Sequence, residues 1–222
     1  MLKPLLVILL FFSFNAHADP GGWVFLYEEA GFKAYENKGP PLSYKAEGIV
    51  DIPLAELVAV LVDVPRQKEW VNRLVESRLI EGSIVTRSVV YSRYALPWPA
   101  KDRDAVVKSV VEENIQQREV RVRFWNTISS AVPPRSDCIR VPRSEGEFTL
   151  KDTGHGSVLV IYTIHLDPGG WLPRWIVRLF VRDAPVKTLR AFKAQVLRTQ
   201  GQYSAFITEQ KARWAGEIQV VR

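Results

Sequence analysis

The sequence predicts an α+β domain in which a run of antiparallel strands is followed by one long C-terminal helix. The middle of the chain alternates apolar and polar residues, most clearly in "REVRVRFW" at 118–125. After "DPGG" at 167–170 the apolar spacing becomes that of a helix. Strands grouped in sequence and followed by a helix are typical of a fold in which the helix covers one face of the sheet. One domain accounts for the chain, which shows no internal repeat.

The first 18 residues have the layout of a secretory signal peptide. Lys3 precedes an apolar run from Leu5 to Phe12, and Ala16-His17-Ala18 forms an A-x-A cleavage site. The apolar run is about half of the ~20 residues that a membrane-spanning helix needs. We therefore expect residues 1–18 to be removed and the mature chain to work in the periplasm or outside the cell. An uncleaved membrane anchor is the alternative.

The N-terminal half is expected to combine short helices with two strands. Trp23 to Ala30 predicts a short helix, whereas residues 32–37 and 43–50 alternate like strands. "DIPLAELVAVLVD" at 51–63 begins with an acidic residue and a proline, which predicts an apolar helix. A second short helix is predicted over 66–74, where it carries Trp70.

The middle of the chain is predicted to form five more strands. Their residues alternate in hydrophobicity, and turn residues separate them. The predicted strands span 85–96, 105–114, 119–130, 147–151 and 157–166. On the third of them Val120, Val122 and Phe124 should face one side of the sheet, and Arg121 and Arg123 the other. "DTGHG" at 152–156 should join the last two as a hairpin, because it is rich in glycine.

The terminal helix is predicted over 173–198 with one broad apolar face. Pro185 lies inside this pattern and should kink the helix or split it in two. Arg174, Arg178 and Arg182 are spaced four apart and should form a ridge on another face. Because a helix N-terminus favours anions, local stability does not explain three cations there. We expect this ridge and Trp175 to contact an anionic membrane surface; a solvated charged face is the alternative.

The composition narrows the class of function. The formal net charge is +6, a modest excess that favours anionic surfaces, and the expected export argues against nucleic acid. Cys138 is the only cysteine, so an internal disulfide is excluded and a small buried residue is expected. After the first 18 residues the chain has only His155 and His165, and no G-x-S-x-G, H-E-x-x-H or glycine-rich phosphate loop. We expect a monomer with no metal, no cofactor and no catalytic activity.

Several segments taken in order show what the chain resembles. They include "AEGIVDIP", "LVDVPRQKEWV", "YSRYALPWPAKDRDAVV", "CIRVPRSEGEFTL", "VLVIYTIHLDPGGWLPRWIV" and "APVKTLRAFK". Together they resemble the START family, the steroidogenic acute regulatory protein-related lipid-transfer domains. The resemblance implies a helix-grip fold, in which a curved antiparallel sheet wraps around the C-terminal helix. It also implies an elongated apolar cavity for one lipid, closed by that helix and a neighbouring loop.

The resemblance divides the chain into a signal peptide (1–18), a lipid-binding domain (19–198) and a partly helical C-terminal extension (199–222). The class of lipid stays open between a phospholipid, a fatty-acyl lipid and a sterol-like molecule. Sterol-binding members resemble one another in a buried arginine on the strand after the Arg-Asp pair. This chain has Lys108, Ser109 and Val110 there, and Ser109 is expected to face the cavity. The side chains expected to line the cavity are Val107, Ser109, Val122, Phe124, Tyr162, Ile164, Leu189 and Phe192.

The charged segment "PWPAKDRD" at 97–104 is interpreted as a structural corner. Its prolines lack backbone donors, which suits an edge corner, and Trp98 is expected to anchor that corner in the core. Arg103 should make a bidentate bond to a carboxylate, either Asp102, Asp104 or a distant acid.

Two other functions remain open from the sequence. A cyclase or hydrolase acting on a hydrophobic substrate in the same kind of cavity would need an ionisable group pointing inward, and His165 and Asp104 are the first suspects. A surface-binding module could instead recruit a partner through Pro133-Pro134 and the extension at 199–222.

Overall fold

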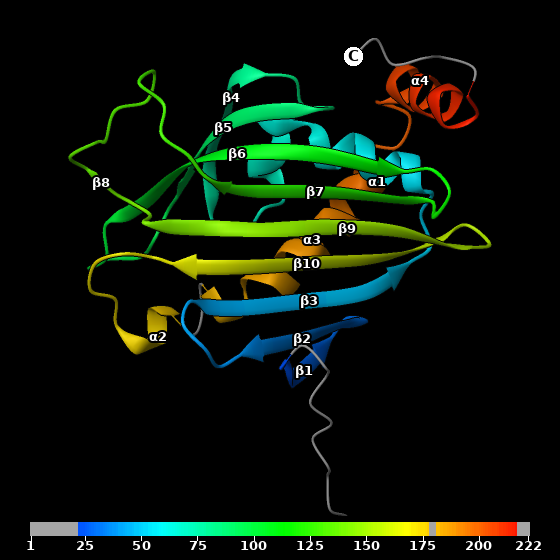
Figure 1. Cartoon of the computed structure of the whole chain (residues 1–222). Helices are drawn as coiled ribbons and strands as arrows, with labels where there is room; N and C mark the ends of the chain where they lie inside the picture. Colours follow the sequence, from blue (N-terminus) through cyan, green and yellow to red (C-terminus); the bar gives the residue numbers. More distant parts are fainter. Residues whose placement is uncertain (1–21, 178–180, 217–222) are drawn as a thin grey trace, which may run out of the picture.

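A long, curved antiparallel sheet dominates the structure, a computed structural model that describes residues 22–177 and 181–216. Figure 1 shows the strands stacked across the molecule, with α2 near one end of the sheet and α4 near the other. The predicted signal peptide lies outside the described residues. The fold class predicted from the sequence, an α+β fold with a curved antiparallel sheet around a C-terminal helix, is confirmed.

The sheet has ten strands, nine of them in the order β1-β2-β3-β10-β9-β7-β6-β5-β4. The strands are β1 (Val24–Glu29), β2 (Phe32–Asn37), β3 (Leu42–Val50), β4 (Leu74–Gly82), β5 (Arg87–Tyr94), β6 (Asp102–Asn114), β7 (Glu119–Asn126), β8 (Cys138–Arg140), β9 (Arg143–Gly154) and β10 (Ser157–Asp167). The short β8 pairs with β6 in parallel, and every other pair is antiparallel. Hairpins join most neighbours, so the chain folds back on itself along the sheet.

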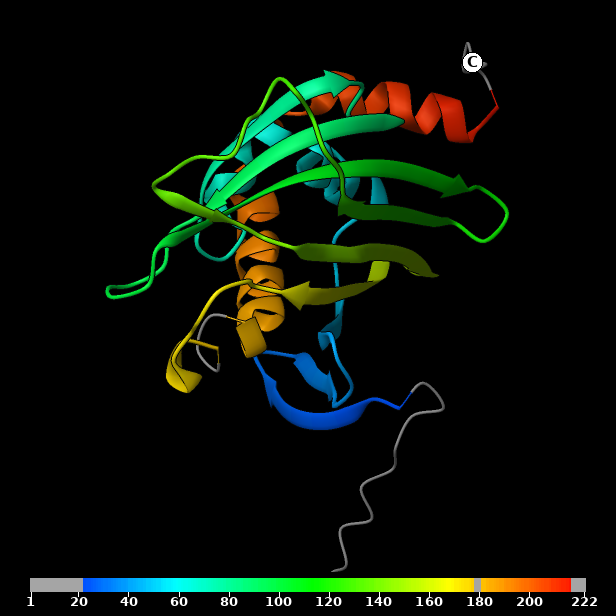
Figure 2. The ribbon, with the colours of Figure 1, turned by 60° about the vertical axis from the view of Figure 1, so that its left-hand side comes forward.

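The described residues also contain five helical segments. They are α1 (Leu54–Val62), the 3₁₀ helix η1 (Val64–Glu69), α2 (Arg174–Val177), α3 (Ala184–Arg198) and α4 (Ser204–Trp214). Figure 2 shows the sheet curving around α3, which crosses its concave side. The predicted terminal helix is split, because Asp183 forms a bend and α3 begins at Ala184. Pro185 occupies the first turn of α3, where a proline is tolerated.

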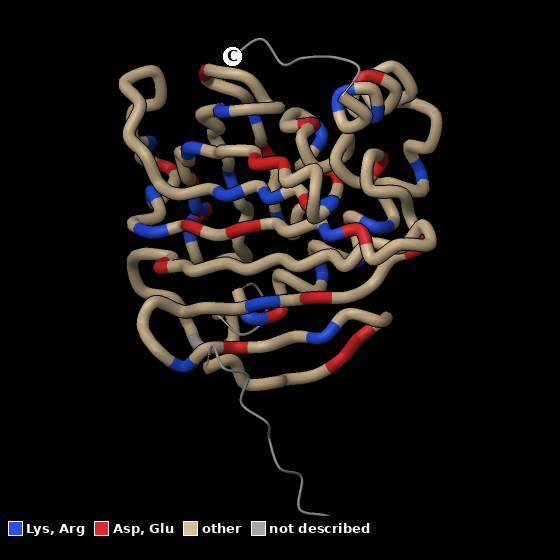
Figure 3. Tube along the Cα trace, turned by 45° about the vertical axis from the view of Figure 1, so that its right-hand side comes forward, with Lys and Arg blue, Asp and Glu red and all other residues tan. Residues whose placement is uncertain are grey.

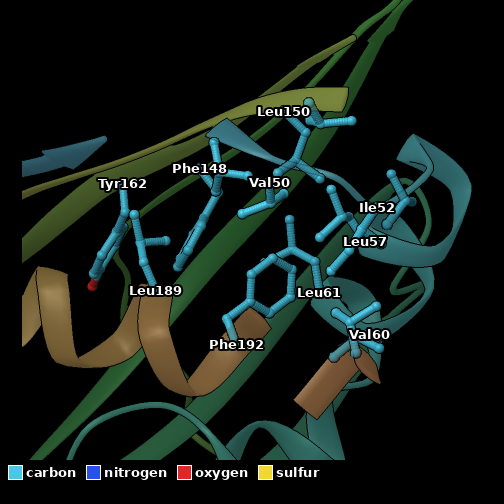
Figure 4. Packing of buried hydrophobic residues seen from close by; sticks show 14 of the residues in the cluster. Val50, Ile52, Leu57, Val60, Leu61, Phe148, Leu150, Tyr162, Leu189 and Phe192 are labelled. Atoms are coloured by element: carbon cyan, nitrogen blue, oxygen red, sulfur yellow. The ribbon is translucent and has the colours of Figure 1, made fainter. Parts of the chain in front are cut away.

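The main core lies between the concave face of the sheet, α1 and α3. On α3 the buried residues Val186, Leu189, Phe192 and Val196 recur every three or four positions, which is the apolar face predicted from the sequence. Figure 4 shows Leu189 and Phe192 pointing from α3 toward the sheet. Helix α1 is apolar on nearly every side, because the sheet, α3 and α4 all pack against it.

Two N-terminal predictions were wrong. Trp23 to Ala30 forms β1 and not a helix, and the register shift between Phe25 and Tyr27 explains why its alternation is broken. The second short helix is η1, which ends at Glu69 before Trp70. The sequence also gave no sign of β4, which has two register shifts along its length and lies at the edge of the sheet. Bulges interrupt the period of two on which strand prediction depends.

The convex face of the sheet carries the charges. Figure 3 shows basic and acidic positions interspersed along the strands. On β7, Arg121 and Arg123 point outward as predicted, and they pair with Glu119 and Glu112. This face is also covered locally by the chain between β7 and β8, under which Tyr91 and Val106 form a second, smaller apolar cluster with Val132.

The C-terminal end of α3 is held to η1 by a network around Glu69. Its carboxylate accepts hydrogen bonds from Arg66 (Nε to Oε1, 2.8 Å), Gln195 (2.7 Å) and Arg198 (3.3 Å). The bond from Arg66 is the main reason that the pKa of Glu69 falls to about 2. The carboxylate is therefore charged near neutral pH, and this end of α3 is tied to the body of the protein.

The helical part of the C-terminal extension packs against the rest of the protein. Helix α4 packs against α1, and Glu113 at the end of β6 accepts hydrogen bonds from Trp214 Nε1 (3.0 Å) and Gln210 Nε2 (2.8 Å). Residues 217–222 lie outside the described residues.

Candidate functional site

Two adjoining cavities of about 90 Å³ each lie on the concave side of the sheet. The first, here called the inner cavity, is bounded by α1, η1 and strands β4 to β7, β9 and β10. The second, here called the loop cavity, lies under α2 and the start of α3, beside the loop that follows β10. Val71, Tyr94, Ser144 and Tyr162 line both, so the two cavities share a wall.

No charged side chain lines the inner cavity within the part of the chain that the structure describes. Its apolar wall is interrupted by hydroxyl groups, which come from Ser88, Ser92, Tyr94, Ser109, Ser144 and Tyr162. Ser88 and Ser109 face each other directly across the pairing of β5 and β6. Trp70 also lines the cavity, and its buried indole Nε1 has no hydrogen-bond partner among the described residues. The cavity therefore offers an apolar surface with polar groups that can bind a ligand's donors or acceptors.

The two faces of β5 are reversed from the usual arrangement. Its hydroxyl-bearing residues face the main core, and an aromatic residue faces the opposite side of the sheet. Ser88, Ser92 and Tyr94 point into the cavity together with Val90, whereas Tyr91 points outward into the second apolar cluster. Sequence reasoning missed these serines, because a strand normally turns its apolar residues toward the main core. The orientation of these serines could have been predicted from the chain between β7 and β8, which supplies an apolar cover for Tyr91.

Burial changes the acidity of the two tyrosines at the shared wall. The pKa of Tyr162 is raised well above its usual range, mainly by burial and further by the nearby Tyr94. Burial also raises the pKa of Tyr94, although a hydrogen bond with Ser92 acts the other way. Both groups are therefore neutral hydroxyls that can donate and accept hydrogen bonds.

The structure places most of the side chains expected to contact lipid at these cavities. Val107, Ser109, Val122, Phe124 and Tyr162 line the inner cavity, and Tyr162 and Ile164 line the loop cavity. Leu189 and Phe192 lie in the main core on the inward face of α3. Phe148, which was not predicted, connects the two groups: its ring stacks on Tyr162 at 4.1 Å and lies 6.4 Å from Phe192. Lipid contact by these eight residues stays a prediction.

Arg103 lines the loop cavity, and its hydrogen-bond partners differ from those predicted. It donates three hydrogen bonds to backbone carbonyls, from Nε to Pro168 (3.0 Å), Nη1 to Lys101 (2.5 Å) and Nη2 to Gly169 (2.8 Å). Among the described residues it has no carboxylate partner, so the predicted bidentate bond to an acid is wrong. Its side chain is 4% exposed, and burial lowers the pKa of Arg103.

The two acids beside Arg103 have other arginines as partners. Asp102 accepts bonds from Arg93 at 2.7 and 2.9 Å, and Asp104, which is fully buried, accepts bonds from Arg140 at 2.9 and 3.0 Å. Because strand residues alternate between faces, Asp104 points to the convex side while Arg103 points to the concave side. The ion-pair partner of each of these charged residues is thus set by the face of the sheet to which its side chain points, and not by nearness in sequence.

Trp98 was expected in the core, but it is 90% exposed. The loop that carries it leaves the same end of the sheet as the loop after β10, since Arg103 bonds the carbonyls of Pro168 and Gly169. Two other tryptophans near this end are exposed, Trp171 at 79% and Trp175 at 47%. The end of the molecule at the loop cavity therefore presents three aromatic side chains to solvent.

The predicted arginine ridge does not lie on one helix. Arg182 falls between α2 and α3, with its guanidinium 5.8 Å from the ring centre of Tyr27. Its Nε is buried without a hydrogen-bond partner among the described residues. Arg178 and the side chain of Arg174 lie outside the part of the chain that the structure describes. Membrane contact by this group stays a prediction, and the described geometry favours Trp175 over Arg182 for it.

Both suspects for an enzymatic group point away from the cavities. His165 lies on the convex face, where its Nδ1 is 2.8 Å from Ser43 Oγ and its ring packs near Trp23. Asp104 is held by Arg140 on the same face. Within residues 22–177 and 181–216 no cluster of three or more histidines, cysteines or acids could hold a metal ion. Over the same residues no helix is long and apolar enough to cross a membrane.

A larger hollow of about 460 Å³ lies at the opposite end of the sheet, between the start of α1 and the end of α4. Its lining mixes apolar residues with charges that already have partners: Arg118 pairs with Asp152, and Glu113 is bonded by Trp214. Because most of its ionic groups pair within the chain, we place the candidate site at the inner and loop cavities.

Comparisons with known proteins agree with this architecture. A family model described as the START domain matches residues 12–201. The uncharacterized protein PA1579 of Pseudomonas aeruginosa is 31% identical over 185 residues, covering 81% of this chain and 88% of that protein. The mouse START domain-containing protein 10 is 25% identical and the human ceramide transfer protein 22%, covering 75% and 80% of this chain. The chain spans 59% and 32% of the length of these two relatives.

Solved structures show the same fold. A fragment of the STAR-related lipid transfer protein of Xanthomonas axonopodis is 26% identical, with a TM-score of 0.70 over 79% of this chain and 98% of the fragment. Human STARD10 is 22% identical, with a TM-score of 0.74 over 91% of this chain and 84% of its own. The Zhui aromatase/cyclase of Streptomyces is more distant, at 14% identity and a TM-score of 0.50 over 71% of this chain and 94% of its own.

Proposed function

The chain belongs to the START domain family, and from this premise we propose that it binds one lipid molecule in the inner and loop cavities and carries it between membranes. The observation that carries the proposal is the hydroxyl-bearing inner cavity between the sheet, α1 and η1, whose described lining has no charged side chain. An apolar wall with a few polar groups suits a molecule with a long hydrocarbon part. Relatives named for lipid or ceramide transfer support the same class of ligand.

The small size of the cavities fits a closed form of the protein. An apolar cavity of ~150 Å³ holds a molecule of the size of benzene, so 90 Å³ cannot hold a lipid without widening. An empty hollow of ~500 Å³ would cost about 12 kcal/mol at ~24 cal/mol per Å³. That cost rivals the ~5–15 kcal/mol stability of a whole domain. We therefore infer that the aromatic wall, with Phe124, Phe148 and Tyr162, closes when lipid leaves, and that bound lipid stabilises the open form.

The entry route is proposed at α2. Leu172, Ile176 and Val181 cover the loop cavity, and they belong to the segment between β10 and α3. At the base of this segment Gly169 and Gly170 have φ values of 64° and 63°, a backbone conformation that side-chain-bearing residues rarely adopt. The other end of α3 is fixed to η1 by Glu69. Movement of the α2 segment therefore opens the loop cavity without displacing the rest of α3.

The exposed tryptophans are proposed to dock this end of the molecule on a membrane. Indole rings favour the boundary between lipid headgroups and hydrocarbon, and the net positive charge favours an anionic surface. Docking would place the α2 segment at the bilayer, where a lipid can pass into the cavity. With the signal-peptide pattern of residues 1–18, we propose a periplasmic or secreted site of action.

Replacing Trp98 and Trp171 together by alanine is expected to weaken docking. Both side chains are largely exposed and line neither cavity, so the fold and the binding of detergent-dispersed lipid should be unchanged. Cosedimentation with vesicles of phosphatidylcholine and phosphatidylglycerol should fall about tenfold, as should the rate of lipid transfer between vesicles. Trp125→Ala, on the convex face, is the matched control. Cosedimentation and transfer equal to those of the wild type would contradict membrane docking by this surface.

A further inference from the structure

We propose that the loop cavity binds an oxyanion, so that the ligand is an amphiphile whose phosphate or carboxylate group lies against Arg103. This proposal rests on the proposed function, since it names the chemical class of the ligand. The hydrocarbon part would lie in the inner cavity, whose described lining has no charged side chain, and the anionic group in the loop cavity.

The first support is the absence of a countercharge for Arg103. Its side chain is 4% exposed, and among the described residues no carboxylate lies within ion-pair distance of it. The other arginines of this corner are neutralised, Arg93 by Asp102 and Arg140 by Asp104. Among the described residues that line the loop cavity there is neither aspartate nor glutamate. Arg103 is therefore a buried cation that the described chain solvates with carbonyl groups but does not neutralise.

The second support is the unused hydrogen-bonding capacity of Arg103. A guanidinium group has five N–H donors, and three of them bond the carbonyls of Lys101, Pro168 and Gly169. One N–H remains on each terminal nitrogen. A phosphate or carboxylate oxygen is the acceptor that suits such donors best, because charge-assisted hydrogen bonds are roughly twice as strong as neutral ones. Carbonyl groups alone leave the buried positive charge uncompensated, which is costly in an apolar surrounding.

The third support is the arrangement of groups around the cavity. Arg73 lines it as well and adds a second positive charge on the exposed side. Tyr94 lies beside Arg103 on the neighbouring strand, and Tyr162 and Ser144 complete the wall shared with the inner cavity. A headgroup against Arg103 would also lie near these hydroxyls, which can donate hydrogen bonds to it. The apolar chain would continue past them toward Ser109.

Competition between lipids within one vesicle tests the proposal. Vesicles of phosphatidylcholine carry equal minor amounts of dioleoyl phosphatidic acid, oleic acid and dioleoylglycerol, so that the vesicle surface is the same for all three probes. The full chain is incubated with these vesicles, separated from them and analysed by native mass spectrometry. We expect phosphatidic acid or oleic acid to be taken up at least about tenfold over dioleoylglycerol. The arm that dominates identifies the oxyanion as a phosphate or a carboxylate.

Substitutions at the two arginines assign the effect to the cavity. Arg103→Gln keeps donors for the carbonyl groups but removes the charge, and it should reduce uptake of the anionic probe at least about tenfold while leaving dioleoylglycerol uptake unchanged. Arg103→Lys should retain most of the preference. If Arg103→Gln does not fold, the variants Arg73→Gln and Leu172→Glu test the oxyanion site instead. Both residues lie at positions of the lining that are at least partly exposed, where a substitution disturbs the fold less. Each should lower anionic uptake, and Leu172→Glu should lower it more.

The outcomes separate this inference from the proposed function. Equal uptake of all three probes, or a preference for dioleoylglycerol, would overturn the oxyanion site and leave lipid binding in place. An anionic preference that survives in every folded variant would overturn the assignment to Arg103. Uptake of no probe by the wild type would overturn both proposals.

Discussion

Replacing Val107 by tryptophan is expected to abolish lipid uptake while the protein stays folded. Val107 lines the inner cavity in the middle of β6, opposite Val90 on β5. The larger indole would fill a space of about 90 Å³ and block the widening that a hydrocarbon chain requires. Overpacking of this kind costs about 1–3 kcal/mol, which is less than the ~5–15 kcal/mol stability of a domain. Uptake of fluorescent lipid from vesicles should fall to background.

The neighbouring residue supplies a matched control for this substitution. Lys108 follows Val107 on the same strand, and its side chain points to the convex face. Lys108→Trp introduces the same indole one residue away, outside both cavities. It should leave lipid uptake within about twofold of the wild type, since surface substitutions change stability by only ~0.5 kcal/mol. Equal loss of uptake in both variants would show that the inner cavity is not the site.

Replacing Arg140 by alanine is expected to lower the free energy of unfolding by about 3–5 kcal/mol. Its guanidinium bonds both carboxylate oxygens of Asp104, which is completely buried. Removing Arg140 leaves that carboxylate without its counterion beneath the chain between β7 and β8. Arg140 itself is partly exposed, so the loss should lie toward the lower end of this range. Urea unfolding followed by tryptophan fluorescence measures it.

An exposed ion pair gives the comparison for this effect. Arg123 and Glu112 pair on the same convex face with both side chains about half exposed. Arg123→Ala should cost less than about 1 kcal/mol, because solvent screens exposed pairs. If Arg140→Ala costs no more than Arg123→Ala, the Asp104 pair does not anchor this corner. Neither substitution should change lipid uptake by the folded protein, since both groups lie on the face opposite the cavities.

The fold could be predicted well from the sequence where the local periodicity agrees with the tertiary structure. The alternation around Val122 placed the strand and its inward face correctly, and the apolar spacing around Phe192 placed the helix that the sheet encloses. Sequence prediction failed at β1 and β4, where register shifts break the period of two. It also extended the terminal helix through the segment between Val177 and Ala184. Asp183 forms a bend in that segment, and α3 begins at Ala184 with Pro185 in its first turn.

The candidate site was only partly predictable, because several of its features depend on what lies across the sheet. Ser109 was expected to face the cavity and does. The serines of β5 were not expected, since nothing near them in sequence shows that Tyr91 has an apolar cover of its own. Arg103 was assigned a carboxylate because two lie beside it in the chain. Strand geometry sends those acids to the other face, and Arg103 bonds carbonyl groups that come from a loop 65 residues later.

Native mass spectrometry of the full chain, purified from its own host and then incubated with mixed liposomes, tests the central claim most directly. We expect a species whose mass exceeds that of the chain by one lipid, with the lipid identified after extraction. The Val107→Trp variant should be recovered without it. Repeated recovery of the bare chain, with no lipid taken up from the liposomes, would contradict a lipid-binding cavity on the concave side of the sheet.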